Sequence, residues 1–385
     1  MLRVDGGAGN ARAGHAPPDR FRRRQEHHGE NDGHQRPSLE GRAARLFLCG
    51  PRRARRRCGR RWFGRARLGQ GNSPERERLT SQSASISLAR ILRAILALSF
   101  LALACSPKRV ALNSLADAFS QSGEGGAFAR DNDPELVRDA VPFALKTMEA
   151  LADSLDDHVV LRLGMARGFT QYAYAFVQQP AELGMPPQEA QKEMARARRF
   201  FLRARQYGLE GLRLARGLGE EEVRKRELGK AQKEEVPLLY WTLAPWAAAI
   251  AADKRDLALV GDVPVVAAML DRAFALDESY DKGALHEFAI TFDPARPEGT
   301  TSEKQKAHFD RARQLSEGVK ISVLVAYAEA VLGPAQDKKG YEALLKEAAA
   351  FDVEQPKARN YRLANVLAQR RAQYLLSHEE DVFSN

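Results

Sequence analysis

The sequence predicts an all-α fold for residues 132–385, built from antiparallel helix hairpins in a tetratricopeptide-like superhelical array. Apolar residues recur at helical spacing in one segment after another, and alternating strand patterns are almost absent. A small residue also stands three positions before an aromatic residue or leucine at Ala273, Ala312 and Ala348, at intervals of 39 and 36 residues. Such intervals are typical of stacked helix hairpins. The alternative is a set of unrelated amphipathic helices that share alanine and leucine.

The first helix of this region carries a clear start signal. Asp133 is an N-cap residue, Pro134 follows at the first helical position, and Glu135 places an acid at the positive end of the helix dipole. The helix is predicted to run past Leu151, and Pro142 is expected to bend it. Further long helices are predicted at 159–178, 187–216 and 236–252. The last of these is nearly all apolar, so we expect it to be buried. Shorter helices are predicted at 263–276, 302–315, 320–332, 339–351 and 357–376.

The segment before the helical region resembles an export signal. Two arginines, Arg90 and Arg93, precede an apolar run of about eleven residues that ends at Ala104, directly before Cys105. This order is typical of a bacterial lipoprotein signal, and the run is too short to remain as a membrane-spanning helix. We therefore predict a signal peptide at 81–104, lipid attachment at Cys105 and a linker at 105–131. The chain is then periplasmic and lipid-anchored, and Ser106 favours the outer membrane.

Residues 1–80 have an unusual composition. They contain 20 arginines, no lysine and 8 acidic residues, and show no helical or strand pattern. One interpretation is a disordered basic arm that binds nucleic acid. We favour the other, an extension translated upstream of the true start, because a signal peptide should open a protein. Residues 105–385 hold 38 basic and 42 acidic residues, so this part is mildly acidic and is not expected to bind nucleic acid.

No motif in the sequence predicts catalysis, a metal site or a bound cofactor. His286 and Glu287 begin like a zinc-binding His-Glu-x-x-His motif, but Ile290 stands where the second ligand would be. Cys105 is the only cysteine after residue 58, so no disulfide framework is expected there. The sequence lacks a nucleophile elbow and a phosphate-binding loop. The chain is therefore predicted not to be an enzyme.

Three clusters of residues are candidates for a ligand site or a pore lining. Tyr172 and Tyr174 point to different sides of their predicted helix. Both rings cannot pack against the same core, so one of them is expected to contact a second surface. Arg196, Arg199 and Arg203 share one helix face, where guanidinium groups could grip a carboxylate.

The third cluster is Tyr240, Trp241 and Trp246. The two tryptophans are five residues apart and point about 140° away from each other. For the aromatic clusters the alternative is ordinary core packing. For the arginines it is a solvated face paired with glutamate.

These clusters lie within four blocks that together resemble a known family. From about Asp131 to Phe383 the chain resembles the T-component proteins of tripartite ATP-independent periplasmic (TRAP) transport systems. The residues around Leu276–Tyr280, with Gly283, His286 and Glu287, also fit. The four blocks are Gly168–Val177, Arg196–Leu209, Val236–Trp246 and Tyr361–Ala372.

The resemblance implies more than the residues show by themselves. Members of the family are expected to be periplasmic lipoproteins with a tetratricopeptide-like helical fold, and to form homotrimers with a pore or groove through each subunit. They are expected to partner the substrate-binding P-component and to pass a small organic solute to it. The arginines of this chain favour a carboxylate as that solute. The alternative function is that of a general envelope lipoprotein that scaffolds protein assembly.

Overall fold

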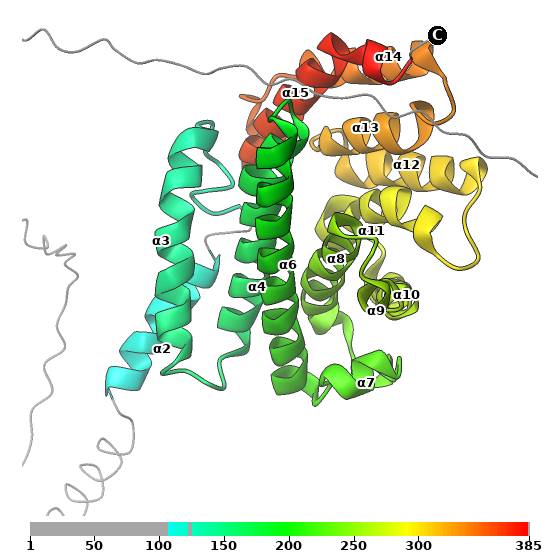
Figure 1. Cartoon of the computed structure of the whole chain (residues 1–385). Helices are drawn as coiled ribbons and strands as arrows, with labels where there is room; N and C mark the ends of the chain where they lie inside the picture. The colour runs from blue at the N-terminus through cyan, green and yellow to red at the C-terminus, as the bar shows by residue number, and fades with distance from the viewer. Residues whose placement is uncertain (1–106, 122–124, 384–385) are drawn as a thin grey trace, which may run out of the picture. The chain divides into compact units, whose positions relative to one another are not determined.

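The computed structural model describes residues 107–121 and 125–383, which belong to one compact unit, Ser81–Asn385 (Figure 1). The predicted extension at 1–80, the signal peptide at 81–104 and Cys105 lie outside the described residues. The described part is helical and contains no strand, so the all-α prediction is confirmed.

The longer helices are separated by short helical turns. The first seven α-helices are α2 (Pro107–Gln121), α3 (Pro134–Ala152), α4 (Val159–Ala173), α5 (Gln179–Glu182), α6 (Pro187–Arg216), α7 (Glu220–Arg224) and α8 (Val236–Ala252). The remaining ones are α9 (Leu257–Val260), α10 (Val263–Asp277), α11 (Tyr280–Phe292), α12 (Ser302–Ser316), α13 (Ser322–Tyr327), α14 (Lys338–Ala349) and α15 (Arg362–Ser377). Two π-helical segments, η1 (Tyr174–Gln178) and η5 (Ala328–Leu332), continue α4 and α13.

The strongest sequence signals predicted helix bounds accurately. Helices α6 and α8 begin and end where predicted, because proline opens each and Gly217, in the left-handed conformation, ends α6. Helix α11 is not among the predicted helices. Its first turn contains three consecutive residues with positive φ, Asp281, Lys282 and Gly283, and such a turn interrupts the apolar periodicity.

The linker predicted at 105–131 is corrected by the structure, because α2 occupies Pro107–Gln121. Leu112, Ala116 and Phe119 recur at helical spacing and pack against the core, and Ala116 is fully buried. Only the stretch after α2 remains a connection. The helix therefore begins two residues after Cys105.

Helix α6 is the central element of the N-terminal part, and it packs between α4 and α8 (Figure 1). The register shows that α6 and α8 are antiparallel: Gly208 lies against Thr242 and Gly211 against Leu238. Small residues allow this approach, since a Cβ added at Gly208 would lie 2.2 Å from Thr242 Oγ1 and 3.0 Å from its Cα. Close contact between these two helices thus depends on glycine at position 208.

Two hydrophobic clusters follow each other along the chain. The first runs from α2 to α11, and the second from Ile290 to α15. The three alanines of the repeat-like pattern, and Ala204 three residues before Tyr207, are almost wholly buried, as expected for small residues at helix contacts. They are Ala204, Ala273, Ala312 and Ala348.

The last helix returns to the first ones. The amide of Leu363 in α15 donates to the carbonyl of Ala129, 3.1 Å away, and Arg370 pairs with Glu135 at the start of α3. The described helices therefore form antiparallel pairs whose final member contacts an early one, while the tetratricopeptide-like superhelix itself stays a prediction. Within 107–121 and 125–383, no helix has the length and apolarity needed to cross a membrane.

The contact at Gly208 gives a direct test of this packing. Gly208→Ala is expected to reduce the free energy of unfolding by about 1–3 kcal/mol, because the new methyl group overlaps Thr242. Chemical denaturation followed by circular dichroism measures the change. Gly229→Ala is the matched control, since a Cβ there meets nothing within 4 Å. Equal stability of the two variants would contradict the close contact.

Candidate functional site

Three departures from regular helix geometry mark the candidate site. Two are the π-helical segments η1 and η5, and the third is the left-handed stretch Asp281–Gly283. Positive φ at a non-glycine residue costs on the order of 1–3 kcal/mol, and π-helical turns are frequent at functional sites. All three segments deliver side chains to one ionic and aromatic cluster.

Helix α15 joins the two π-helical segments. Arg371 Nε lies 2.7 Å from Glu329 Oε2 of η5, and Arg371 Nη1 lies 2.9 Å from Glu182 Oε2 of α5. Tyr174 opens η1 and is close enough to Arg371 for the two charges to interact. Burial raises the pKa of Tyr174 although 46% of the residue is exposed.

The left-handed stretch orients the Asp281 carboxylate toward Tyr361 and Lys320. The hydroxyl of Tyr361 donates to Asp281 Oδ1 at 2.8 Å, and Lys320 Nζ lies 3.5 Å from Asp281 Oδ2. The same ammonium group lies 3.3 Å from Glu287 Oε2. Burial would lower the pKa of Lys320, but Glu287 and Asp281 together raise it above its ordinary value, so Lys320 is charged and held between two carboxylates.

Tyr240 lies within electrostatic range of both ionic groups. Its ring lies 5.0 Å from Trp241, 5.5 Å from Tyr280 and 6.4 Å from Phe288, between ring centroids. Burial raises the pKa of Tyr240, and the charges of Glu287, Asp281 and Tyr174 raise it further. We call the whole set the central cluster: Tyr174, Tyr240, Trp241, Asp281, Glu287, Lys320, Glu329, Tyr361 and Arg371.

The central cluster holds two hydrogen-bonding groups that the described residues do not use. The indole Nε1 of Trp241 is buried without a partner, and no hydrogen bond to the described residues engages the Tyr240 hydroxyl. A buried donor without an acceptor costs roughly 1–3 kcal/mol. The cations, by contrast, are already paired with carboxylates. The cluster can therefore offer donors and aromatic surface to a ligand, but no unpaired cation.

The predicted arginine face forms a separate surface. Arg203 Nε lies 2.7 Å from Glu149, and its guanidinium stacks 5.1 Å from the Phe169 ring centroid. Arg199 and Arg213 have no ion-pair partner among the described residues. Arg205 Nη2 lies 3.6 Å from Glu220 Oε1, while its Nε is buried without a hydrogen-bond partner. These four arginines line a hollow of about 680 Å³ along α6 and the start of α7, which we call the arginine hollow.

The other aromatic candidates belong to the core. Tyr172 is buried and contacts Phe176 and Phe200. Trp246 is 0% exposed, and its Nε1 donates to Asp262 Oδ2 at 3.2 Å. The prediction of Trp246 as a lining residue is thus corrected, because a fully enclosed ring has no surface for a ligand. No contact joins Arg199 or Arg203 to Tyr240 or Trp241, so the predicted ligand residues are divided between two places.

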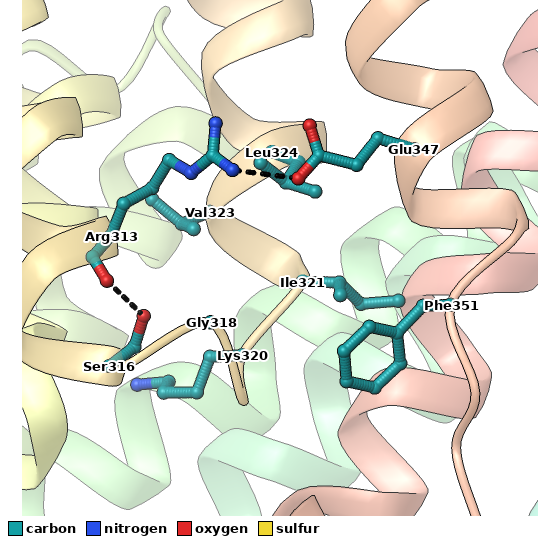
Figure 2. A pocket seen from close by; sticks show the side chains of 9 residues that line it. All are labelled: Arg313, Ser316, Gly318, Lys320, Ile321, Val323, Leu324, Glu347 and Phe351. Carbon is teal, nitrogen blue, oxygen red and sulfur yellow. Dashed lines mark hydrogen bonds and ion pairs between the residues drawn. The ribbon is translucent and has the colours of Figure 1, made fainter.

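A second hollow, near the C-terminal helices, is too small for an organic ligand. Figure 2 shows Lys320 on one side of it and the ion pair of Arg313 with Glu347, 2.7 Å, on the other. Its volume is about 40 Å³, far below the roughly 300 Å³ at which small-molecule sites begin. It therefore adds no candidate site.

Several central-cluster residues were not predicted as site residues. Asp281, Lys320 and Glu329 are distant in sequence from their partners and belong to no local motif. A signal did exist for others, since Glu287 is one of the residues that fit the family resemblance, and Tyr361 and Arg371 lie in its fourth block. Three of the four blocks supply side chains to the cluster. The second block contacts the first through Phe200.

The comparisons with known proteins agree with this architecture. The fold and sites define an all-helical protein with a buried ionic and aromatic cluster. The family model described as TRAP transporter T-component matches residues 130–383, and the chain belongs to this family. An uncharacterized protein of Treponema pallidum (strain Nichols) is 31% identical over 302 residues, covering 72% of this chain and 93% of that protein. The chain is thus an envelope-associated accessory component of a TRAP transporter.

One titratable pair lies beside the central cluster. His286 Nδ1 and His308 Nδ1 are 2.9 Å apart, and His308 Nε2 faces Asp293 at 3.5 Å. Among the described residues, no three His, Cys, Asp or Glu side chains are arranged to hold a metal ion. Burial, together with His308, lowers the pKa of His286 to about 4. The neutral imidazole of His286 is therefore the form that the fold stabilises.

This pair predicts a pH dependence of stability. The unfolded chain, with a histidine pKa near 6.5, binds a proton before the folded chain does, so stability declines as the pH falls from about 6.5 to about 4. The contribution of His286 is on the order of 3 kcal/mol. Urea unfolding at pH 7 and pH 4.5 measures it. His286→Gln should remove this part of the decline, and the exposed control His378→Gln should retain it. An unchanged decline in His286→Gln would contradict the assignment.

Proposed function

We propose that this chain is the lipid-anchored periplasmic accessory subunit of a TRAP uptake system, and that it binds both the P-component and a small organic solute. The observation that carries the proposal is the convergence of η1, η5 and Asp281–Gly283 on the central cluster. Strained backbone persists where the surrounding structure stabilises it, and it gathers at ligand sites. A homotrimer anchored through Cys105, in the outer membrane, is the assembly we expect.

The central cluster is the solute site in this proposal. Trp241 supplies an indole N–H that is buried without a partner among the described residues, and Tyr240 supplies a hydroxyl beside the rings of Tyr280 and Phe288. Lys320 and Arg371 are neutralised by four carboxylates, those of Asp281, Glu287, Glu329 and Glu182. A free carboxylate would therefore meet excess negative charge there. The solute is expected to bind through an apolar body and an uncharged acceptor.

The arginine hollow is the docking surface for the P-component. Arg199 and Arg213 have no ion-pair partner in the part of the chain that the structure describes, and planar guanidinium groups bind carboxylates in a fixed fork. The predicted affinity for carboxylates rests on Arg199 and Arg203, which both line this hollow. The carboxylates that they bind are, in this proposal, acidic side chains of the P-component.

Binding of the P-component is tested with the acylated chain in detergent and the P-component encoded beside its gene. Arg199→Gln with Arg213→Gln is expected to weaken binding at least tenfold, since each charge-assisted hydrogen bond contributes about 1.5–3 kcal/mol. Lys254→Gln with Lys304→Gln removes the same charge from exposed positions and should leave the affinity within about twofold. Light scattering reports whether the core is a trimer. If the chain does not bind the P-component, the result would instead support the alternative function of a general envelope lipoprotein that scaffolds protein assembly.

Solute binding is tested by the fluorescence of Trp241 against small aromatic carboxylic acids and their methyl esters. The esters are expected to bind at least as tightly as the acids. Tyr240→Phe should weaken binding roughly tenfold through one lost hydrogen bond, and Trp241→Phe should remove the signal. Tyr374→Phe, which alters a tyrosine stacked on His378, is the matched control. If the acids bind and their esters do not, the solute is recognised through its carboxylate, and its site would be the arginine hollow instead of the central cluster.

A further inference from the structure

The outward face of α2 is largely apolar beyond its first two charged residues, Lys108 and Arg109. Val110 and Leu115 are 57% and 44% exposed, and they are among the few large apolar side chains of the described residues that face outward. The exposed positions between and after them are Ala111, Ser114 and Ala118, and the exposed charged residues Lys108 and Arg109 precede them at the start of the helix. A helix face in contact with water normally carries charged residues. The exposed positions of α12 show the contrast, since they include Lys304, Lys306 and Asp310.

Polar contacts near both ends fix α2 to the domain. Arg109 Nη2 lies 2.7 Å from Asp157, and Asp117 lies 3.4 Å from His158 Nε2. Near the end of the helix, Arg167 of α4 donates to the carbonyl of Ser120. Because these contacts hold both ends of α2, its outward face has a defined direction relative to the rest of the domain.

The chain leaves little distance between this face and the proposed anchor. Only Ser106 separates Cys105 from Pro107, the first residue of α2. Consecutive Cα atoms are about 3.8 Å apart, so the Cα of Pro107 lies within about 8 Å of the Cα of Cys105. If acyl chains on Cys105 enter the bilayer, α2 begins at the lipid headgroups. This step rests on the lipid attachment included in the proposed function.

We infer that the apolar face of α2 lies against the bilayer, so that Cys105 and α2 are two adjacent membrane contacts. Val110 and Leu115 enter the boundary between headgroups and acyl chains, as amphipathic surface helices do. Lys108, which has no ion-pair partner among the described residues, faces lipid phosphates. A lipid surface is favoured over a second copy of the chain because the anchor itself brings this face to the membrane. The helix then sets the orientation of the whole domain.

The test uses the acylated chain that begins at Cys105, reconstituted in vesicles of phosphatidylethanolamine and phosphatidylglycerol. After acylation the chain has no other cysteine, so Val110→Cys and Leu115→Cys each provide one labelling site for a fluorophore. Nitroxide groups on the lipid acyl chains quench a fluorophore that is in contact with the bilayer. Leu257→Cys is the matched control, since Leu257 is a 78% exposed leucine on α9.

We expect quenching at positions 110 and 115 to exceed quenching at position 257 at least threefold. Equal quenching at the three positions on a chain shown by mass spectrometry to be acylated would overturn the inference and leave the lipid anchor intact. The labels could instead become shielded from water only at high protein density and show no quenching. This result would mean that the apolar face of α2 contacts a second copy of the chain, and it would also overturn the inference. An unmodified Cys105 would overturn both the anchor and the inference.

Discussion

The close packing of α6 against α4 and α8 is the contact on which the rest of the N-terminal part depends. It is possible because α6 presents Gly208 and Gly211 to α8, and because Ala197 and Ala204 are fully buried. Larger side chains would push the helices apart. Aromatic rings on α4 and α6 then meet beside this contact, as Phe169 does with Tyr207. The position of η1, and with it Tyr174, follows from the position of α4.

The central cluster shows how irregular backbone and paired charges support each other. Lys320 and Arg371 are largely buried cations, and each is stable only because carboxylates surround it. The left-handed turn at Asp281 is unfavourable by itself, but it places a carboxylate between Tyr361 and Lys320. The ion pairs thus offset the strain of the left-handed turn, and the turn orients the Asp281 carboxylate toward its partners. Residues from α4 to α15 are joined in this way.

The sequence predicted the helices with strong local signals and missed features that depend on distant partners. Pro187 and Gly217 marked the ends of α6 because proline and glycine act within one turn. The opposite directions of the two tryptophans followed from helix geometry, and Trp246 proved to be the inward one. Lys320 could not be predicted in the same way, since its partners lie 33 and 39 residues earlier in the chain. The π-helical segments were also missed, because their residues have an ordinary α-helical pattern.

The return of α15 to α3 also limits how proteins of this design can evolve. An open solenoid gains or loses hairpins at its end with little effect on the others, because each repeat contacts only its neighbours. Here Leu363 bonds to Ala129 and Arg370 pairs with Glu135. An inserted hairpin would separate these partners and the central cluster as well. Duplication of a repeat unit is therefore disfavoured, and the number of helices should stay constant while the surface loops vary in length.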